Sequence, residues 1–360
     1  MKVLFYISTI RGGGAARVMV NIANGIAEKG YDVVFVTNFP DSHEYELSGK
    51  IKRFSIEQTE NKGNVLAKNI SRIKALKKIL KEENPDVSVA FMRENNFRLL
   101  YAAKGLPTKT VVSVRNDPAK EYSSKFSKRL ANSLYKRADG IVFQTEDAKL
   151  AFPVEIQNKS RVILNQVDER FFNENTAPGK YLTACGRLSN QKNYPMMLKA
   201  FAEVLKEYPD EILRIYGEGN LKDDLAELAG ELGVKESVSF MGFSTQMKEA
   251  YSEAKVLLMT SNYEGLPNVL LEAMASSVPV LSTDCPCGGP KMIIKDGENG
   301  YLAKVGDEKD FAEKLKLVLS DENRLAEMRE GAFRSAQAYR PERILEDWTG
   351  MLEMVSADSN

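Results

Sequence analysis

The sequence is poor in the residues on which many enzymes rely. Of its 360 residues, one is histidine and three are cysteine. The number of cysteines is odd, and Cys185, Cys285 and Cys287 lack the paired CxxC spacing of a zinc site. We therefore expect them to be reduced, structural thiols. A mechanism with a histidine base would have to use His43, which lies in the polar segment FPDSHEYELSG and is expected to be a solvated loop residue.

Long apolar runs are absent as well. No stretch approaches the roughly 18 consecutive apolar residues that suggest a membrane span. The start, MKVLFYISTIRGGG, lacks the apolar core and cleavage site of a signal peptide. We therefore expect a cytoplasmic protein.

The length exceeds what a single hydrophobic core usually supports, which favours two domains. Apolar residues make up 43% of the chain and charged residues 28%, the profile of a soluble globular enzyme. The net charge is zero, but residues 1–170 carry 29 Lys and Arg against 19 Asp and Glu, so the second half is acidic. This split predicts that only the first half faces an anionic surface or acceptor.

Short apolar runs alternate with helical patterns in both halves, which predicts an α/β fold with parallel sheets covered on both faces. The runs expected to be strands lie at 3–7, 33–37, 51–56, 87–91, 110–114 and 140–144, and then at 181–185, 212–216, 238–241, 256–259 and 279–282. The segment 169–179 has little pattern and is expected to be a linker. We therefore assign residues 1–168 to an N-terminal domain, 180–337 to a C-terminal domain and 338–360 to a C-terminal helix that packs back towards the first domain.

Two helical patterns in the first half are basic and amphipathic. Residues 66–81 combine an apolar stripe (Leu66, Ile70, Ile73, Leu76, Leu80) with six cations and no acidic residue. Residues 120–137 repeat Phe126, Leu130 and Leu134 beside Lys125, Lys128, Arg129, Lys136 and Arg137. Such helices can lie on an anionic membrane leaflet. An apolar stripe that faces the core, with a solvated basic back, is an equally good interpretation of either helix alone.

Three loops could receive a phosphate group. Gly12, Gly13 and Gly14 follow the first strand and precede a helix, where free backbone N–H groups attract anions, although a tight turn explains them as well. The loop after 181–185 holds Arg187 and Lys192, which could hold a diphosphate or simply be a basic surface loop. In SNYEGLPNVLLEAMASSVP (261–279), Glu264 precedes a helix entered through Gly265 and Pro267, and Glu272 lies inside it; an ordinary amphipathic helix is the alternative.

Taken together, these segments resemble the retaining, nucleotide-sugar-dependent glycosyltransferases of family four, which have the GT-B fold of two facing Rossmann-like domains. The resemblance is carried, in order along nearly the whole chain, by GGGAARV (12–18), GRLSNQKN (186–193), YGEG (216–219), FMGF (240–243), EGLPNVLLE (264–272) and CGGPKMIIKDGENGYL (287–302). It implies a donor site in the cleft between the domains. It also implies a metal-independent reaction without a cofactor, and the chain contains no DxD triplet.

The resemblance implies a role for each matching residue. Glu264 would contact the transferred sugar and Glu272 the ribose, while Arg187 and Lys192 would neutralise the departing diphosphate. The other expected donor-binding residues are Gly13, Gly14, Arg115, Gly217, Met241, Gly265, Leu266, Pro267, Asn268 and Val269. Three positions depart from the family pattern: Ala16 and Met292 stand where glutamates are common, and Arg115 or Asn116 fills the place of a common histidine.

The sequence thus predicts a retaining transferase that moves a hexose or N-acetylhexosamine from a nucleotide sugar, most simply UDP-linked, to a hydroxyl of a lipid-linked saccharide in the assembly of capsule or another cell-surface polysaccharide. Its expected partners are the donor, the acceptor and the anionic inner face of the plasma membrane, with no nucleic acid. A UDP-sugar epimerase on the same fold and a non-catalytic sugar-nucleotide- or membrane-binding subunit are the alternatives.

Overall fold

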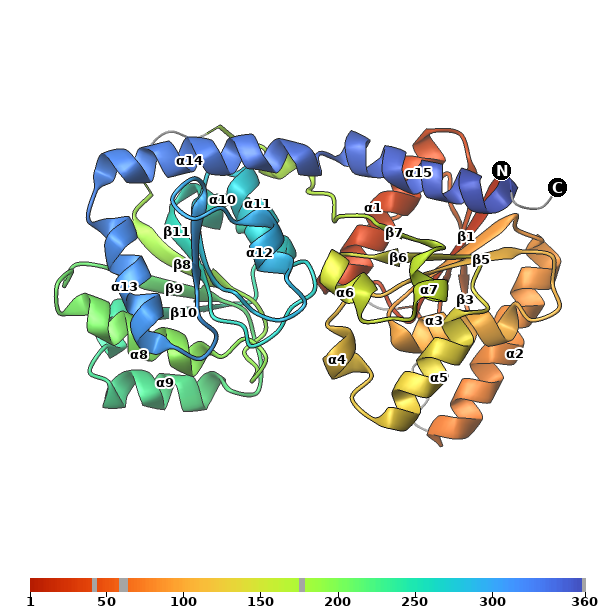
Figure 1. Cartoon of the computed structure of the whole chain (residues 1–360), viewed down its shortest axis with the longest axis horizontal. Helices are drawn as coiled ribbons and strands as arrows, with labels where there is room; N and C mark the ends of the chain where they lie inside the picture. Colours follow the sequence, from red (N-terminus) through yellow and green to blue (C-terminus); the bar gives the residue numbers. More distant parts are fainter. Residues whose placement is uncertain (41–43, 58–63, 175–178, 358–360) are drawn as a thin grey trace. The chain divides into compact units, whose positions relative to one another are not determined.

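The computed structural model describes residues 1–40, 44–57, 64–174 and 179–357, so the prediction for His43 lies outside the described residues. The chain forms two compact units (Figure 1). Unit 1 comprises residues 1–166 and 341–360, and unit 2 comprises residues 167–340. Each unit contains one parallel β-sheet flanked by helices, so the predicted α/β class with two parallel-sheet domains is confirmed.

Unit 1 is built on a sheet of seven parallel strands in the order β3-β2-β1-β4-β5-β6-β7. The strands are β1 (Lys2–Ile7), β2 (Asp32–Thr37), β3 (Lys52–Ser55), β4 (Val87–Phe91), β5 (Lys109–Ser113), β6 (Gly140–Phe143) and β7 (Ser160–Val162). The helices are α1 (Gly14–Glu28), α2 (Val65–Glu83), α3 (Arg93–Ala102), α4 (Pro118–Glu121), α5 (Lys125–Tyr135), α6 (Glu146–Leu150), α7 (Val154–Gln157) and α15 (Pro341–Ala357).

Alternate residues of β1, an inner strand of the unit 1 sheet, point into two different cores. Val3 and Phe5 of β1 pack in one cluster with α1 and with Trp348 of α15, whereas Leu4 and Tyr6 pack in the other with α2 and α3. Successive side chains of a strand leave opposite faces of the sheet, so a sheet covered on both sides needs an apolar strand without alternation. This explains why the strands read as continuous apolar runs.

Unit 2 repeats the architecture with a sheet of six parallel strands in the order β10-β9-β8-β11-β12-β13. The strands are β8 (Tyr181–Cys185), β9 (Leu213–Tyr216), β10 (Val238–Gly242), β11 (Ala254–Met259), β12 (Val280–Thr283) and β13 (Gly300–Ala303). The helices are α8 (Tyr194–Leu205), α9 (Lys222–Glu231), α10 (Met247–Ser252), α11 (Asn268–Ala275), α12 (Gly289–Ile293), α13 (Glu308–Leu319) and α14 (Glu322–Ala336), and the 3-10 turns are η1 (Glu169–Phe171), η2 (Lys235–Ser237) and η3 (Gln337–Tyr339).

The unit boundaries differ from the predicted domain limits. Unit 2 begins at residue 167, and the predicted linker 169–179 starts with η1, whose Phe171 is buried edge-on against Tyr251. Residues 175–178 of this linker lie outside the described residues. The chain returns to unit 1 at residue 341, where α15 packs on α1. The sequence alone does not distinguish a buried residue such as Phe171 from an exposed residue of a linker.

Several smaller elements also differ from the sequence prediction. The helix expected over 120–137 is two helices, because the chain turns between α4 and the Ser124 cap of α5. The loop expected over 284–300 contains α12, which begins beside Pro290, and ends at β13. The strands β7 and β13 are three and four residues long, too short to give a periodic signal.

No helix among the described residues combines the length and the apolar character that a membrane crossing requires. None of the three cysteines, all within the described residues, forms a disulfide: Cys285 and Cys287 are buried, and Cys185 is half-buried.

Candidate active site

The carboxyl ends of the strands of unit 2 carry two loops that are joined to each other by hydrogen bonds. The loop after β8 contacts the loop after β11, its neighbour in the sheet, although about 70 residues separate them. Asn262 donates its backbone N–H to the Gln191 carbonyl at 2.8 Å and its side-chain amide to the Asn190 carbonyl at 2.8 Å. Thr260 donates to the Lys192 carbonyl at 3.0 Å. Strand order therefore brings the two predicted site loops together as one rigid surface.

Lys192 and Glu264 form the ion pair at the centre of this surface. The Lys192 ammonium lies 2.6 Å from Glu264 Oε1, and their side chains are only 17% and 11% exposed. Ser261 donates its hydroxyl to the same carboxylate oxygen at 2.8 Å. Two predicted site residues are thus brought into contact, and a third residue that the sequence analysis did not identify fixes the carboxylate.

Cys285 lies beside this ion pair. Burial raises the pKa of its thiol to about 12, and the Glu264 carboxylate adds to the shift while Lys192 opposes it. The thiol is therefore neutral at physiological pH and packs as a small apolar group beside the ion pair. This agrees with the structural role expected for the cysteines.

Arg187 differs from Lys192 in its environment. It is exposed on the same loop and forms no hydrogen bond or ion pair with the residues that the structure describes. Its guanidinium fork is therefore available to an incoming anion, whereas Lys192 must share its charge with Glu264.

The N-terminus of α11 opens onto the same surface. Pro267 precedes the helix, no side chain caps it, and its first turn has no acidic residue. Gly265 is closely packed: a Cβ on Gly289 would lie 1.8 Å from the Gly265 carbonyl oxygen. Gly265 to Val269 therefore present backbone and a helix dipole rather than bulky side chains, which suits a phosphate group.

Glu272 lies further along α11 and is buried, at 4% exposure, rather than on the outer face that an ordinary amphipathic helix would give it. The Tyr251 hydroxyl from α10 donates to Glu272 Oε2 at 3.3 Å. Tyr251 is itself fully buried and packs against Phe171. No sequence pattern pointed to Tyr251, because a tyrosine in a short helix is an ordinary core residue.

The remaining predicted residues of unit 2 lie at the ends of β9 and β10. Gly217 has φ +144°, and a Cβ there would lie 2.0 Å from the Gly186 carbonyl oxygen, so only glycine fits between the two loops. The Gly217 N–H donates to the Gly242 carbonyl at 2.8 Å. Met241, next to Gly242, is 44% exposed and offers an apolar surface at this edge.

The predicted residues of unit 1 lie at the carboxyl edge of its own sheet. Gly13 has φ +81° and starts α1, which has no side-chain cap. Nothing lies within 4 Å of the position of a Cβ on Gly12 or Gly13, so the loop is open rather than tightly packed. The positive φ of Gly12 and Gly13 already calls for glycine, and the open space beside them leaves their backbone accessible to a ligand.

Arg115 follows β5 and has no acidic partner among the described residues. Its guanidinium donates to Asn165 Oδ1 at 2.5 Å and stacks 4.4 Å from the centre of the Phe91 ring, while its Nε is buried without an acceptor. Burial lowers the pKa of Arg115 to about 9. The strand-end salt bridge that would be the ordinary explanation of this arginine is not formed there.

The two basic helices of unit 1 share a feature that the sequence could not resolve. On α2, Leu76 and Leu80 are buried, but Val65, Leu66 and Ile70 at its N-terminal end are exposed. On α5, Leu134 is buried and Phe126 is 77% exposed. Each apolar stripe thus faces the core only in its C-terminal half. Arg72, expected on the basic face of α2, is instead buried and paired with Glu57 at 2.7 Å.

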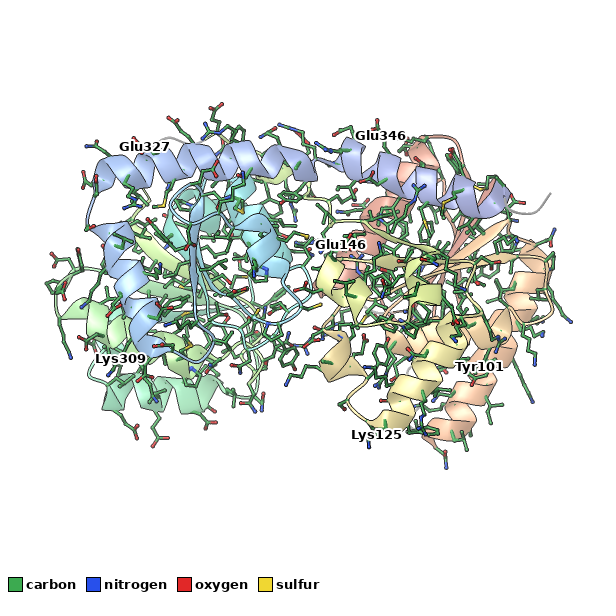
Figure 2. All side chains as sticks on the ribbon, viewed as in Figure 1. Tyr101, Lys125, Glu146, Lys309, Glu327 and Glu346 are labelled. Atoms are coloured by element: carbon green, nitrogen blue, oxygen red, sulfur yellow. The ribbon has the colours of Figure 1, made fainter. Side chains whose placement is uncertain are left out.

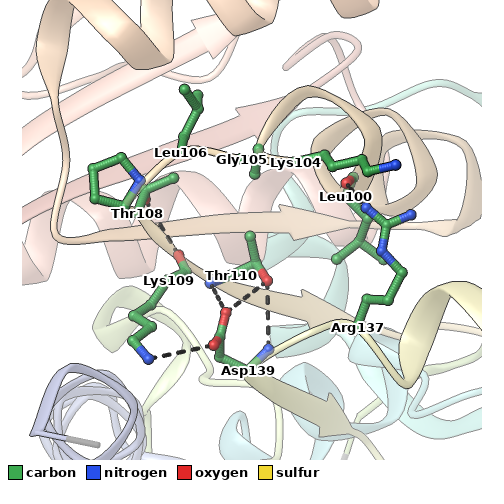
Figure 3. Close-up of a pocket in the computed structure, with 11 residues that line it drawn as sticks. Leu100, Lys104, Gly105, Leu106, Thr108, Lys109, Thr110, Arg137 and Asp139 are labelled. Atoms are coloured by element: carbon green, nitrogen blue, oxygen red, sulfur yellow. Dashed lines mark hydrogen bonds and ion pairs between the residues drawn. The ribbon is translucent and has the colours of Figure 1, made fainter. Parts of the chain in front are cut away.

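A hollow of about 290 Å³ lies at the opposite, amino-terminal edge of the unit 1 sheet (Figure 3). Lys104, Lys109 and Arg137 line it, and Asp139 accepts from the Thr110 N–H at 2.7 Å. Arg137 donates to the Leu100 carbonyl at the C-terminal end of α3. Arg137 thus compensates a helix C-terminus and Lys109 pairs with Asp139 at 3.6 Å, so these two cations have a structural explanation. Among the described residues, no group of three or more His, Cys, Asp or Glu has the geometry to hold a metal ion.

Comparison with known families matches both halves of the chain. Residues 12–171 match the family described as Glycosyltransferase Family 4, and residues 166–335 match Glycosyl transferases group 1. The two matches follow each other along the chain and together include the candidate site residues of both units.

Similar proteins extend over the whole chain. The α-1,4-N-acetyl-D-galactosaminyltransferase of Campylobacter jejuni that acts on a diNAcBac-PP-undecaprenol saccharide is 30% identical, with 99% of each chain covered. The amylovoran biosynthesis glycosyltransferase AmsD of Erwinia amylovora is 26% identical over 98% of this chain and 99% of its own. Among solved structures, Anabaena HepE in complex with UDP has a TM-score of 0.81 at 17% identity and covers 98% of this chain and 100% of its own, which shows a shared fold.

Proposed function

Because this chain belongs to the family-four glycosyltransferases of the GT-B fold, we propose that it transfers a hexose or N-acetylhexosamine from a UDP-sugar to a hydroxyl of a lipid-linked saccharide, with retention at the anomeric carbon. The observation that carries this proposal is the Lys192–Glu264 pair beside the uncapped N-terminus of α11. It places cationic, dipolar and carboxylate groups in one water-poor loop surface. Relatives named for transfer to undecaprenyl-linked saccharides and for amylovoran synthesis support the acceptor class.

The proposed chemistry depends on stabilising the leaving group. As the bond between sugar and diphosphate breaks, negative charge grows on the phosphate oxygens and positive charge on the sugar. Arg187, Lys192 and the α11 dipole favour the first charge, and the Glu264 carboxylate favours the second. Lys192 would then exchange part of its contact with Glu264 for the diphosphate. We propose that no metal ion takes part, because these cations supply the charge that a metal supplies elsewhere.

Each carboxylate then has a separate role. Glu264 is held by Ser261 and Lys192 at the reacting sugar, and Glu272 is held by Tyr251 for the ribose hydroxyls. Neither acts as a general acid or base of the glycosidase kind. The acceptor proton goes to a leaving phosphate oxygen, so the scarcity of histidine does not prevent the reaction.

Donor binding and turnover test this function directly. We expect UDP-sugars to raise the melting temperature more than GDP-sugars; a donor at about 100 times its Kd stabilises by about 2.7 kcal/mol. Incubation with the right UDP-sugar alone should release UDP slowly. With an acceptor added, NMR of the glycosylated product should show retention at the anomeric carbon. An epimer of the donor would instead indicate an isomerase, and stabilisation without any turnover would indicate a non-catalytic binding subunit.

We further propose that unit 1 rests on the anionic inner face of the plasma membrane. The exposed apolar residues of α2 and α5 (Val65, Leu66, Ile70, Phe126) lie in the first two turns of the two helices, among Lys68, Lys125, Lys128 and Arg129. Lys125 projects from the outer end of α5 (Figure 2). Apolar side chains that enter the interface, with cations at the headgroups, fit a peripheral mode of binding.

Vesicle sedimentation checks the membrane proposal. We expect binding to vesicles with phosphatidylglycerol, weakened by salt, and a reduction of about tenfold for Leu66→Ser or Phe126→Ser, because each removes a large apolar contact with the bilayer. Leu150→Ser is the matched control, since Leu150 is similarly exposed on α6 of the same unit. Equal binding to neutral and anionic vesicles would reject the role of the cations, and no binding to either would argue for a soluble acceptor.

A further inference from the structure

The loops after β1 and β4 of unit 1 enter their helices with the same backbone conformation. Gly13 precedes α1 with φ 81° and ψ 145°, and Met92 precedes α3 with φ 75° and ψ 146°. Only glycine normally adopts such angles, because a Cβ crowds the neighbouring backbone there. The first loop therefore has the residue that its geometry calls for, and the second has a methionine in its place.

Three hydrogen bonds fix Met92 in this strained conformation. Its N–H donates to the Ser113 carbonyl of β5 at 3.1 Å, and its carbonyl accepts from the Asn96 N–H at 2.9 Å. The next N–H along the chain, that of Arg93, donates to Glu121 Oε1 at 3.3 Å. A strained residue persists where its surroundings hold it in this way, and such residues cluster at functional sites.

Packing of the Met92 side chain does not explain the strain. Met92 is 45% exposed, whereas Phe91 before it and Ser113 on the neighbouring strand are fully buried. A glycine would form the same three backbone hydrogen bonds without strain and would expose no apolar side chain. The advantage of methionine over glycine at this position therefore lies in what its side chain contacts outside the chain.

Met92 lies where the strand order of the unit 1 sheet reverses. From β1 the chain adds β2 and β3 on one side, and it then crosses to add β4 to β7 on the other. In open parallel sheets, ligands bind beyond the carboxyl ends of the strands at this point of reversal. Met92 follows β4 there, and the open glycine loop at Gly13 follows the adjacent β1.

The groups at this edge suit a sugar better than a phosphate. Met92 offers an apolar, polarisable surface, and the half-buried Asn116 after β5 has an amide nitrogen that makes no hydrogen bond within the described part of the chain. Arg93 is already engaged, by Glu94 at 2.7 Å and by the Glu121 carbonyl at 2.6 Å. A thioether can pack on the C–H face or the acetyl methyl group of a sugar, and an amide can bind its hydroxyls.

We propose that Met92 contacts the apolar face of the acceptor sugar and determines which acceptors the enzyme uses. The hydrogen bonds around Met92 fix the direction of its Cβ, so the contact is organised before the acceptor arrives. This inference rests on the proposed transferase function and names a residue that selects the acceptor. The UDP part of the donor is assigned to unit 2, and its affinity should therefore not depend on Met92.

The substitution Met92→Gly removes the side chain and the strain together. We expect a melting temperature equal to or above that of the wild type, because glycine adopts φ 75° freely. We also expect the affinity for acceptor sugars to fall about tenfold, since one large apolar contact is lost. Loss of an ordinary core methionine would instead lower the melting temperature.

Two further variants make the comparison specific. Met92→Leu keeps an apolar side chain on the same strained backbone and should retain at least half of the sugar binding. Asn84→Gly is the matched control: Asn84 follows α2 with φ 44°, so glycine is tolerated there as well, and sugar binding should not change.

The measurement is saturation-transfer NMR in excess UDP, with the methyl glycosides of galactose, glucose, N-acetylgalactosamine and N-acetylglucosamine as probes. In the wild type, saturation should be strongest on the protons of one ring face or on the acetyl methyl group of at least one probe. Met92→Gly should reduce that saturation about tenfold, as one lost apolar contact predicts. Isothermal titration should give the same Kd for UDP in all four proteins.

Three results would overturn this role of Met92: no saturation of any probe by the wild type, saturation that survives Met92→Gly, or a melting temperature that falls by several degrees in that variant. A weaker affinity of Met92→Gly for UDP would also reject it, because the residue would then serve the donor. The proposed transferase function is tested separately, since it is rejected when no UDP-sugar releases UDP, whatever the probes show.

Discussion

Replacing Lys192 by methionine is expected to lower kcat about 100- to 1000-fold, the loss typical of removing one charged group that stabilises a leaving group. Methionine keeps the length of the side chain and removes the ammonium that lies 2.6 Å from Glu264. The diphosphate then loses a cation, and the Glu264 carboxylate loses its partner in a largely buried site. Turnover should therefore fall more than KM rises, as measured by steady-state UDP release.

The control for this change is another ion pair of unit 2. Lys255 pairs with Glu211, with side-chain exposures of 24% and 11%, close to those of Lys192 and Glu264. Lys255 is the second residue of β11, at the amino edge of the sheet and away from the candidate site. Lys255→Met should cost similar thermal stability and leave kcat unchanged. A Lys192→Met enzyme that retains turnover within threefold of the wild type would reject the assignment of Lys192.

The second large effect is expected for Glu272→Gln, which should weaken UDP binding about 10- to 100-fold. A buried carboxylate that accepts hydrogen bonds from both ribose hydroxyls contributes about 1.5–3 kcal/mol through charge-assisted bonds. Glutamine keeps the size and one acceptor oxygen but not the charge. Because the ribose is bound in the ground state and in the transition state alike, KM should rise more than kcat falls. Isothermal titration with UDP measures the binding step separately.

Two variants separate this role from a general effect of burial. Tyr251→Phe removes the 3.3 Å hydrogen bond to Glu272 and should weaken UDP binding by only about two- to fivefold, because the carboxylate itself remains. Glu83→Gln removes another buried carboxylate, which pairs with Lys2 and Lys52 in unit 1, and should reduce stability without changing the affinity for UDP. Unchanged UDP affinity in Glu272→Gln would contradict the ribose assignment.

The sequence by itself determined the layout of the sheets. Apolar runs with helical segments between them give parallel strands, and parallel strands place their following loops at one edge. For that reason Gly13, Lys192 and Glu264 could be predicted at carboxyl ends before any contact was known. The family motifs, found in order across both halves, assigned roles to individual residues. A single glycine loop or one pair of glutamates would not have been enough for that assignment.

Only the tertiary structure decided which of these residues touch. The contact between Lys192 and Glu264 joins residues 72 positions apart, and it exists because β8 and β11 are neighbours in the sheet. Helical periodicity places Leu66 and Leu76 on the same stripe of α2, but it does not say where the body of unit 1 stops covering that stripe. Periodicity is a local property of the chain, whereas burial depends on what packs against it. The ion pair and the exposed ends of α2 and α5 follow from that second property.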